Sequence, residues 1–191
     1  MSAVALADDA PAIERRNLIW VALCLGTMVA AIASDDPFAL NFVHVLTGLL
    51  WTGIDLFMGL VIGPILRRVD APVRRAIALR LMPRTLFIMP TLAIIAPTTG
   101  WYLADLYGLT GLAWPDFGWM AAALVISTLL GVLGLGVILP TNLIVFLELR
   151  KREPDGRKIA RLMQRYIYAV ALQGAMQVGI VIVMSRFATG I

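Results

Sequence analysis

Two titratable side chains, His44 and Asp55, lie in an otherwise apolar stretch of this 191-residue sequence, HVLTGLLWTGIDLFMG. His44 is the only histidine in the chain. A neutral imidazole is the commonest metal ligand among side chains, and a carboxylate in hydrocarbon must be paired, hydrated or protonated. The stretch therefore offers metal ligation or a structural contact between helices at His44, and proton or ion binding at Asp55.

If the stretch is a helix, one of its faces is small or polar and the other is apolar. At about 100° per residue, Trp51 and Asp55 lie about 20° to either side of His44, and Gly48 lies about 40° away. The opposite arc holds Leu46, Leu50, Phe57 and Leu60. We expect the polar face to point into a helix bundle, with His44 and Asp55 about 16 Å apart along the axis and unable to touch.

Asp55 needs a partner, and the sequence has no arginine at the same depth of an apolar stretch. Gln173 and Gln177 are one helical turn apart in a later apolar stretch, so both amides could donate to Asp55. Two interpretations fit these residues. The glutamines can be structural polar contacts between helices, and Asp55 can be either part of that contact or a proton or ion site.

The composition determines what positions these side chains. Hydrophobic residues make up 60% of the chain, charged residues 15%, and the mean hydropathy is +0.87. Five stretches are long enough to cross a membrane as helices: 18–34, 38–66, 85–107, 117–147 and 166–187. The sequence predicts an all-α polytopic protein, with a tail at 1–16 and a single five-helix domain at 17–191.

The basic residues predict the orientation. They gather before the first stretch and in the connections after the second and fourth, whereas the other two connections carry aspartates. By the positive-inside rule the N-terminus is cytoplasmic and the C-terminus is outside. The first stretch then acts as a retained signal-anchor helix. This arrangement explains the net charge of +4 without nucleic acid.

The second and third stretches resemble the fourth and fifth. VIGPILRR and VILPTNLI each carry a proline, Pro64 or Pro140, ahead of a basic connection, and Arg84 corresponds to Arg165. We predict a repeat of 38–107 and 117–187, and hence a four-helix bundle of two parallel helix pairs plus an N-terminal helix. The alternative is that cytoplasmic connections look alike because all of them need arginine.

The pattern His44-x6-Trp51-x-Gly53, followed by MPRTLFIMPTLAIIAPTTGWYL at 82–103, resembles a group of bacterial membrane proteins. The group comprises the HemJ-type protoporphyrinogen oxidases, the copper-resistance D proteins and the membrane part of urate oxidase-like proteins. The resemblance implies that His44 is a b-haem ligand and that Arg84 is a family arginine. The lysine and second histidine of the HemJ pattern are absent, so it implies a related haem or redox role instead.

Three functions follow as expectations. The first is a protein of redox or haem metabolism that binds one haem b through His44, beside Gly48 and Trp51, and exchanges electrons with a periplasmic carrier. Its sixth ligand would be Met58, Met176, the His44 of a second protomer, a partner protein, or nothing. The second is a non-catalytic subunit of a larger respiratory or photosynthetic complex. The third is a small proton-coupled transporter that uses Asp55.

Overall fold

The computed structural model describes residues 16–190, and helices make up nearly all of this range, with no strand in it. Residues 1–15, most of the expected N-terminal tail, lie outside the described part. Five helical segments are long and apolar enough to cross a membrane. The prediction of an all-α polytopic protein with five spans is therefore confirmed for the described chain.

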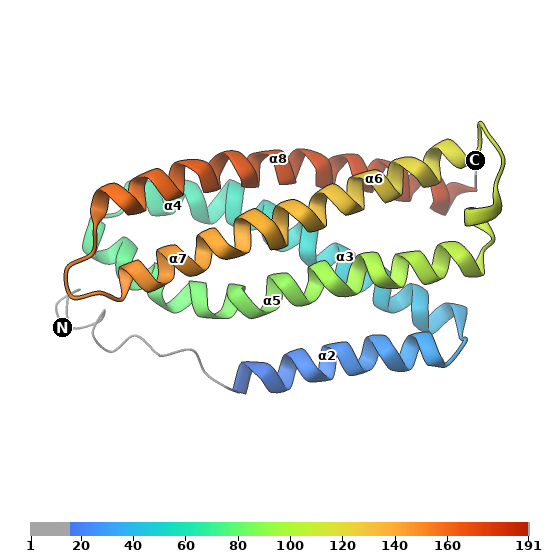
Figure 1. The fold of residues 1–191 in the computed structure, drawn as a ribbon, viewed down its shortest axis with the longest axis horizontal. Coiled ribbons are helices and arrows are strands. Elements are labelled where there is room, and N and C mark those ends of the chain that lie inside the picture. The colour runs from blue at the N-terminus through green and yellow to red at the C-terminus, as the bar shows by residue number, and fades with distance from the viewer. Residues whose placement is uncertain (1–15, 191) are drawn as a thin grey trace.

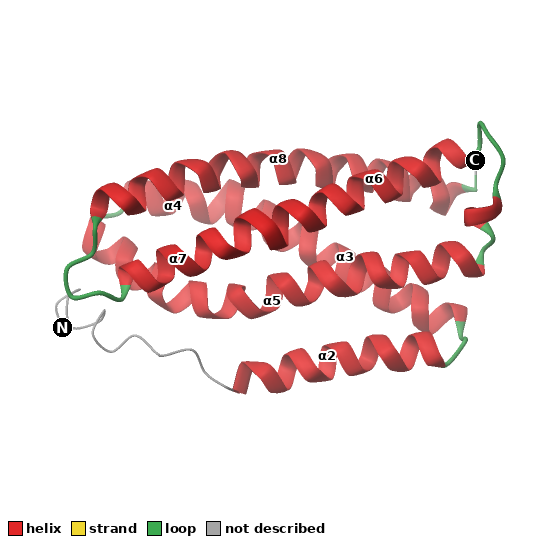
Figure 2. Ribbon diagram, viewed as in Figure 1, coloured by secondary structure: helices red, strands yellow, loops and turns green. Residues whose placement is uncertain are grey.

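The first span is α2 (Arg16–Ala33), and the second runs through α3 (Pro37–Phe57), η1 (Met58–Ile62) and α4 (Gly63–Arg68). The third is α5 (Ala71–Leu106), which a short turn, η2 (Leu109–Gly111), follows. The fourth runs through α6 (Phe117–Leu133), η3 (Gly134–Ile138) and α7 (Leu139–Leu149), and the fifth is α8 (Gly156–Thr189). Short loops join these segments (Figure 2).

Two of the spans begin much earlier than hydropathy predicts. The expected third and fifth stretches start at Thr85 and Tyr166, whereas α5 starts at Ala71 and α8 at Gly156. At 1.5 Å per residue, 36 residues extend for about 54 Å, and hydrocarbon accounts for only about 30 Å. Hydropathy marks the part of a helix in lipid, so it misses the basic amphipathic turns that continue the same helix into the headgroup region and beyond.

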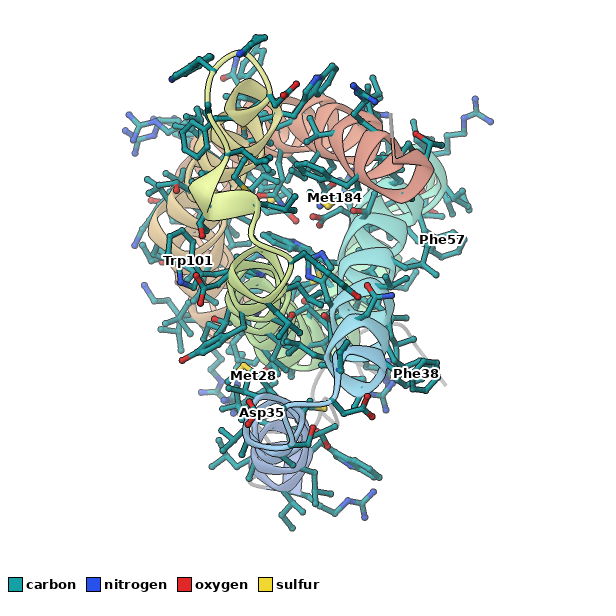
Figure 3. The ribbon with its side chains drawn as sticks, turned by 90° about the vertical axis from the view of Figure 1, so that its right-hand side faces the viewer. Met28, Asp35, Phe38, Phe57, Trp101 and Met184 are labelled. Atoms are coloured by element: carbon teal, nitrogen blue, oxygen red, sulfur yellow. The ribbon has the colours of Figure 1, made fainter. Side chains whose placement is uncertain are left out.

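The spans form a four-helix bundle with one additional helix (Figure 1). The segments α3–α4, α5, α6–α7 and α8 run side by side, and α2 packs on the outside against α5 and α3. An apolar cluster of Ala31, Leu40, Val43, Ile95 and Leu103 attaches α2 to the bundle. Viewed along the bundle, α3, α5, α6 and α8 surround a common interior; Met184 points into it, and Phe38 and Phe57 point away (Figure 3).

Each helix pair contains a π-helical turn directly before its proline. In η1 the Gly63 amide bonds to the Met58 carbonyl, and in η3 the Leu139 amide bonds to the Gly134 carbonyl, five residues back in each case. Pro64 or Pro140 follows immediately. A proline has no amide hydrogen and its ring clashes with the carbonyl four residues back, and a wider turn relieves that clash. The two pairs therefore share a break at equivalent positions.

One end of the bundle, which we call the basic end, holds the α4–α5 and α7–α8 connections. There the Arg75 side chain on α5 donates to the carbonyls of Leu149 and Lys151, at 3.0 and 3.1 Å. Buried Glu148 pairs with Lys151 and Lys158, each at 2.9 Å. These contacts fix the end of α7 against α5 and α8. The other end, with the α2–α3 and α5–α6 connections, is called the opposite end.

Candidate functional site: a buried carboxylate with two glutamines

Asp55 lies near the middle of the Pro37–Arg68 span, one turn before η1. Gln173 and Gln177 on α8 both donate their amide Nε2 to the same carboxylate oxygen, Oδ2, and the Gln177 bond measures 2.7 Å. The expected pairing of these three residues is confirmed. Leu46, Leu50, Phe57 and Leu60, on the opposite arc of the same span, are exposed. Asp55 therefore faces the bundle because the apolar arc of its helix faces outward.

The glutamine side chains use only their amide donors and leave their acceptors unpaired within residues 16–190. Gln173 is 2% exposed and Gln177 is 1% exposed, so both amides are removed from solvent. Their Nε2 groups reach Asp55, but both Oε1 atoms are buried without a hydrogen-bond partner among the described residues. A buried carbonyl without a donor costs about 1–3 kcal/mol. The cluster thus holds two unused oxygen acceptors beside a carboxylate.

Apolar packing surrounds this polar cluster. Trp51, one turn before Asp55, lies beside the carboxylate. Its indole packs with Leu92, Ala93, Ala96 and Leu130. A Cβ atom on Gly134, within η3, would lie 3.5 Å from the Gln173 Oε1 and 3.9 Å from the indole. The site is therefore built by α3 of the first pair and by α8 and η3 of the second.

No cation of the described chain neutralises Asp55. The ion pairs within residues 16–190 are those of Glu148 with Lys151 and Lys158, at the basic end. Asp55 receives only neutral amide donors. A carboxylate at such a depth costs several kcal/mol when it is ionised and unpaired, so it must hold a proton, lie beside a cation or be hydrated.

The polar stripe continues from the glutamines toward the basic end. Tyr166 lies two turns before Gln173 on α8, and its hydroxyl lies close to the side chain of Asn142 on α7. Tyr166 continues the helical spacing of the glutamines, but sequence reasoning missed Asn142 and the place of Gly134 beside Gln173. Asn142 could have been found because an amide two residues after Pro140 is polar in an apolar stretch. Gly134 could not, since its role depends on how α6 packs against α8.

His44 forms a separate contact between α3 and α5. Its Nδ1 lies 2.9 Å from the Ala96 carbonyl and 3.4 Å from the Thr99 hydroxyl. The ring sits directly on Gly100, where an added Cβ would come within 2.7 Å of the imidazole Cε1. The carbonyl requires a donor, so Nδ1 carries the hydrogen, and Nε2 has no hydrogen-bond partner in residues 16–190.

The residues expected around a haem at His44 do not gather there. Gly48 does leave space, since an added Cβ would meet no atom within 4 Å. The Trp51 indole, however, is covered by the apolar cluster. Arg84 is exposed on α5, twelve residues and about 18 Å before Ala96. Met58 is about 21 Å along the same span from His44, too far to share a metal with it.

Met176 on α8 packs against the apolar cluster that contains Trp51 and Ala96. Within the described range, no group of three or more histidine, cysteine or acidic side chains is arranged to hold a metal ion. No family model matches the chain, and no curated protein or solved structure is detectably similar to it. The resemblance based on the His44 motif therefore stays a hypothesis.

Proposed function

We propose that this chain is a small proton-coupled transporter of the bacterial inner membrane, and that Asp55 takes up and releases the coupling proton. One observation carries the proposal: a carboxylate inside the bundle is held only by neutral donors, and these come from the other helix pair. Ionisable residues inside membrane spans are rare and commonly mark ion or proton pathways.

The chemistry of the glutamines suits a group that changes its protonation state. An amide presents hydrogen-bond donors on one side and an acceptor on the other, and its terminal torsion is broad. Against a carboxylate, Gln173 and Gln177 present Nε2, as observed. Against a protonated carboxyl group, one amide turns and Oε1 accepts the hydroxyl hydrogen. The same three residues can therefore accommodate both forms.

The position of the site also supports transport. In transporters built from repeats, the coupling site lies near the membrane midplane between the repeats, beside interrupted helices. Asp55 meets Gln173 and Gln177 between the two helix pairs, and η1 and η3 interrupt the helices beside it. π-Helical turns occur frequently at functional sites. We propose that the pairs move relative to one another, with the basic end facing the cytoplasm.

Solid-supported membrane electrophysiology tests this proposal. Proteoliposomes holding the full chain receive a rapid pH jump, and the expected result is a transient current from proton binding. Asp55→Asn should abolish the current while the protein keeps its helicity and its elution volume. Asp116→Asn is the matched control, because Asp116 is exposed and its side chain caps no helix. A current that survives in Asp55→Asn would refute the assignment.

A second candidate function is binding of one b-type haem through His44, in redox or haem metabolism. The observation in its favour is the bond from Nδ1 to the Ala96 carbonyl, because ligating histidines commonly use one ring nitrogen this way and leave the other for the metal. His44 and the open space at Gly48 fit a single axial ligand. A sixth ligand would come from the His44 of a second protomer in a homodimer, or from a partner protein.

The visible spectrum of the purified protein, expressed with haem precursor, tests this candidate. Haem ligation predicts a Soret band in the wild type that is lost in His44→Ala. A bound haem that can be reduced would then exchange electrons with a periplasmic electron carrier. A wild-type protein without a Soret band would exclude the haem function. Chains that copurify would then favour a non-catalytic subunit of a respiratory or photosynthetic complex.

A further inference from the structure

We infer that Asp55, Gln173 and Gln177 form a binding site for a monovalent metal cation, with Na⁺ as the fitting ion, and that the cation competes there with the proton. The inference rests on the proposed function and names the second ion of the same site. We call these three residues the Asp55 cluster.

The first argument is the supply of oxygen atoms. Hard cations such as Na⁺ bind carboxylate and amide oxygens in preference to nitrogen or sulfur. The Asp55 cluster has a carboxylate and two amide oxygens, and both amide oxygens are buried without a partner. Glutamines that served only as a contact between helices would leave both of these carbonyls unsatisfied. A cation satisfies them and the carboxylate together.

The second argument is charge. Neither described ion pair involves Asp55, because both belong to Glu148. One bound monovalent cation makes the site neutral, whereas a divalent cation would leave a net positive charge buried among apolar side chains, which is strongly unfavourable. The site is therefore selective for monovalent over divalent cations, and a proton and Na⁺ are alternative occupants of the same carboxylate.

The third argument is convergence. Gln173 and Gln177 are one turn apart on α8, and both reach the same Oδ2 atom. A half-turn of each amide places Oε1 where Nε2 now lies, which changes a cluster that holds an anion into one that holds a cation. Gly134 provides space beside Gln173, because the nearest side-chain atom to its missing Cβ is the Gln173 Oε1 itself, at 3.5 Å.

Binding of ²²Na⁺ to the purified full chain, measured by scintillation proximity in nanodiscs, tests the inference. The wild type should bind saturably, with an affinity that falls as the pH is lowered because protons occupy Asp55. Asp55→Asn should abolish binding, and Gln173→Leu and Gln177→Leu should each weaken it by about tenfold, as expected for the loss of one ligand. Gln164→Leu, an exposed position on the same helix, is the matched control and should bind as the wild type does.

Gly134→Ala keeps the test decisive if a cluster variant fails to fold. The added methyl makes an ordinary contact, at 3.5 Å, with the end of the Gln173 amide that must turn when the cation binds, so the protein should fold and bind ²²Na⁺ more weakly. No saturable binding in the wild type would overturn the inference, as would binding that Asp55→Asn leaves intact. If the pH-jump current persists without ²²Na⁺ binding, the proton proposal stands and the cation site falls; if both are absent, both fall.

Discussion

At the residue scale, His44 and Gly100 depend on one another. The imidazole lies where a side chain at position 100 would lie, and its Nδ1 donates to the Ala96 carbonyl on the same helix. The close approach of α3 and α5 at this level therefore requires both the ring and the missing Cβ. This holds whether or not Nε2 also binds a metal.

We expect Gly100→Ala to destabilise the protein by about 1–3 kcal/mol, because the new Cβ at 2.7 Å displaces the imidazole and breaks its bond to Ala96. Unfolding in mixed micelles of increasing SDS content measures the change. Gly48→Ala is the control, since its Cβ meets no atom within 4 Å and should be neutral or slightly stabilising.

A double-mutant cycle decides the cause. With the ring removed by His44→Ala, the further change Gly100→Ala should cost almost nothing. A cost that stays the same in that background would mean that the glycine serves the path of α5 and not the imidazole.

The sequence predicts some of these residue contacts and not others. The Asp55 cluster could be predicted because inward facing follows from helical spacing, and an intramembrane carboxylate has few donors to choose from. The contact of His44 with Ala96 and Gly100 could not. It depends on the relative height of α3 and α5, which side-chain packing sets and no local pattern records.

At the element scale, the same distinction applies to helix ends. The cores of the spans follow from hydropathy, whereas α5 and α8 start well before the apolar stretches, and only the start of α8 has a side-chain cap. Asp155 caps α8, where its side chain accepts from the amides of Arg157 and Lys158. Asp70 precedes α5 in the corresponding place, but its side chain accepts no capping bond.

This difference gives a matched pair of variants. Asp155→Ala should lower stability by about 1 kcal/mol, because two helical amides lose their acceptor. Asp70→Ala should change stability by much less. Unfolding in mixed micelles, as above, compares the two, and equal losses would show that the cap at Asp155 does not stabilise α8.

The two hydrogen bonds from the Arg75 side chain belong to the same scale, because they join the end of α7 to α5. Arg75→Met keeps the aliphatic part of the side chain and removes the two bonds to the Leu149 and Lys151 carbonyls. Amide hydrogen exchange in residues 150–155 should become faster, since the end of α7 and its loop open more readily. Arg74→Met, at an exposed neighbouring position, should leave exchange unchanged.

At the scale of the whole molecule, the described chain crosses the length of the bundle five times, so the first span and the last span run in the same direction. We expect single cysteines at Asp36 and Trp114 to react with an impermeant thiol reagent added outside intact cells, in a Cys24→Ser background. Cysteines at Arg74 and Arg152 should react only after the cells are opened. Labelling of the Arg74 site from outside would reverse the orientation, although the bundle itself would be unaffected.

The contacts of Arg75 and Glu148 at the basic end determine where the two helix pairs can separate. Arg75 and Glu148 fasten α5, α7 and α8 together there, and no hydrogen bond among the described residues joins the two pairs in the same way at the opposite end. If the pairs move as rigid bodies, they pivot at the basic end and separate at the opposite end. The site between them would then open first to the side that carries the aspartate-bearing loops, because two rigid bodies separate most at the end farthest from their pivot.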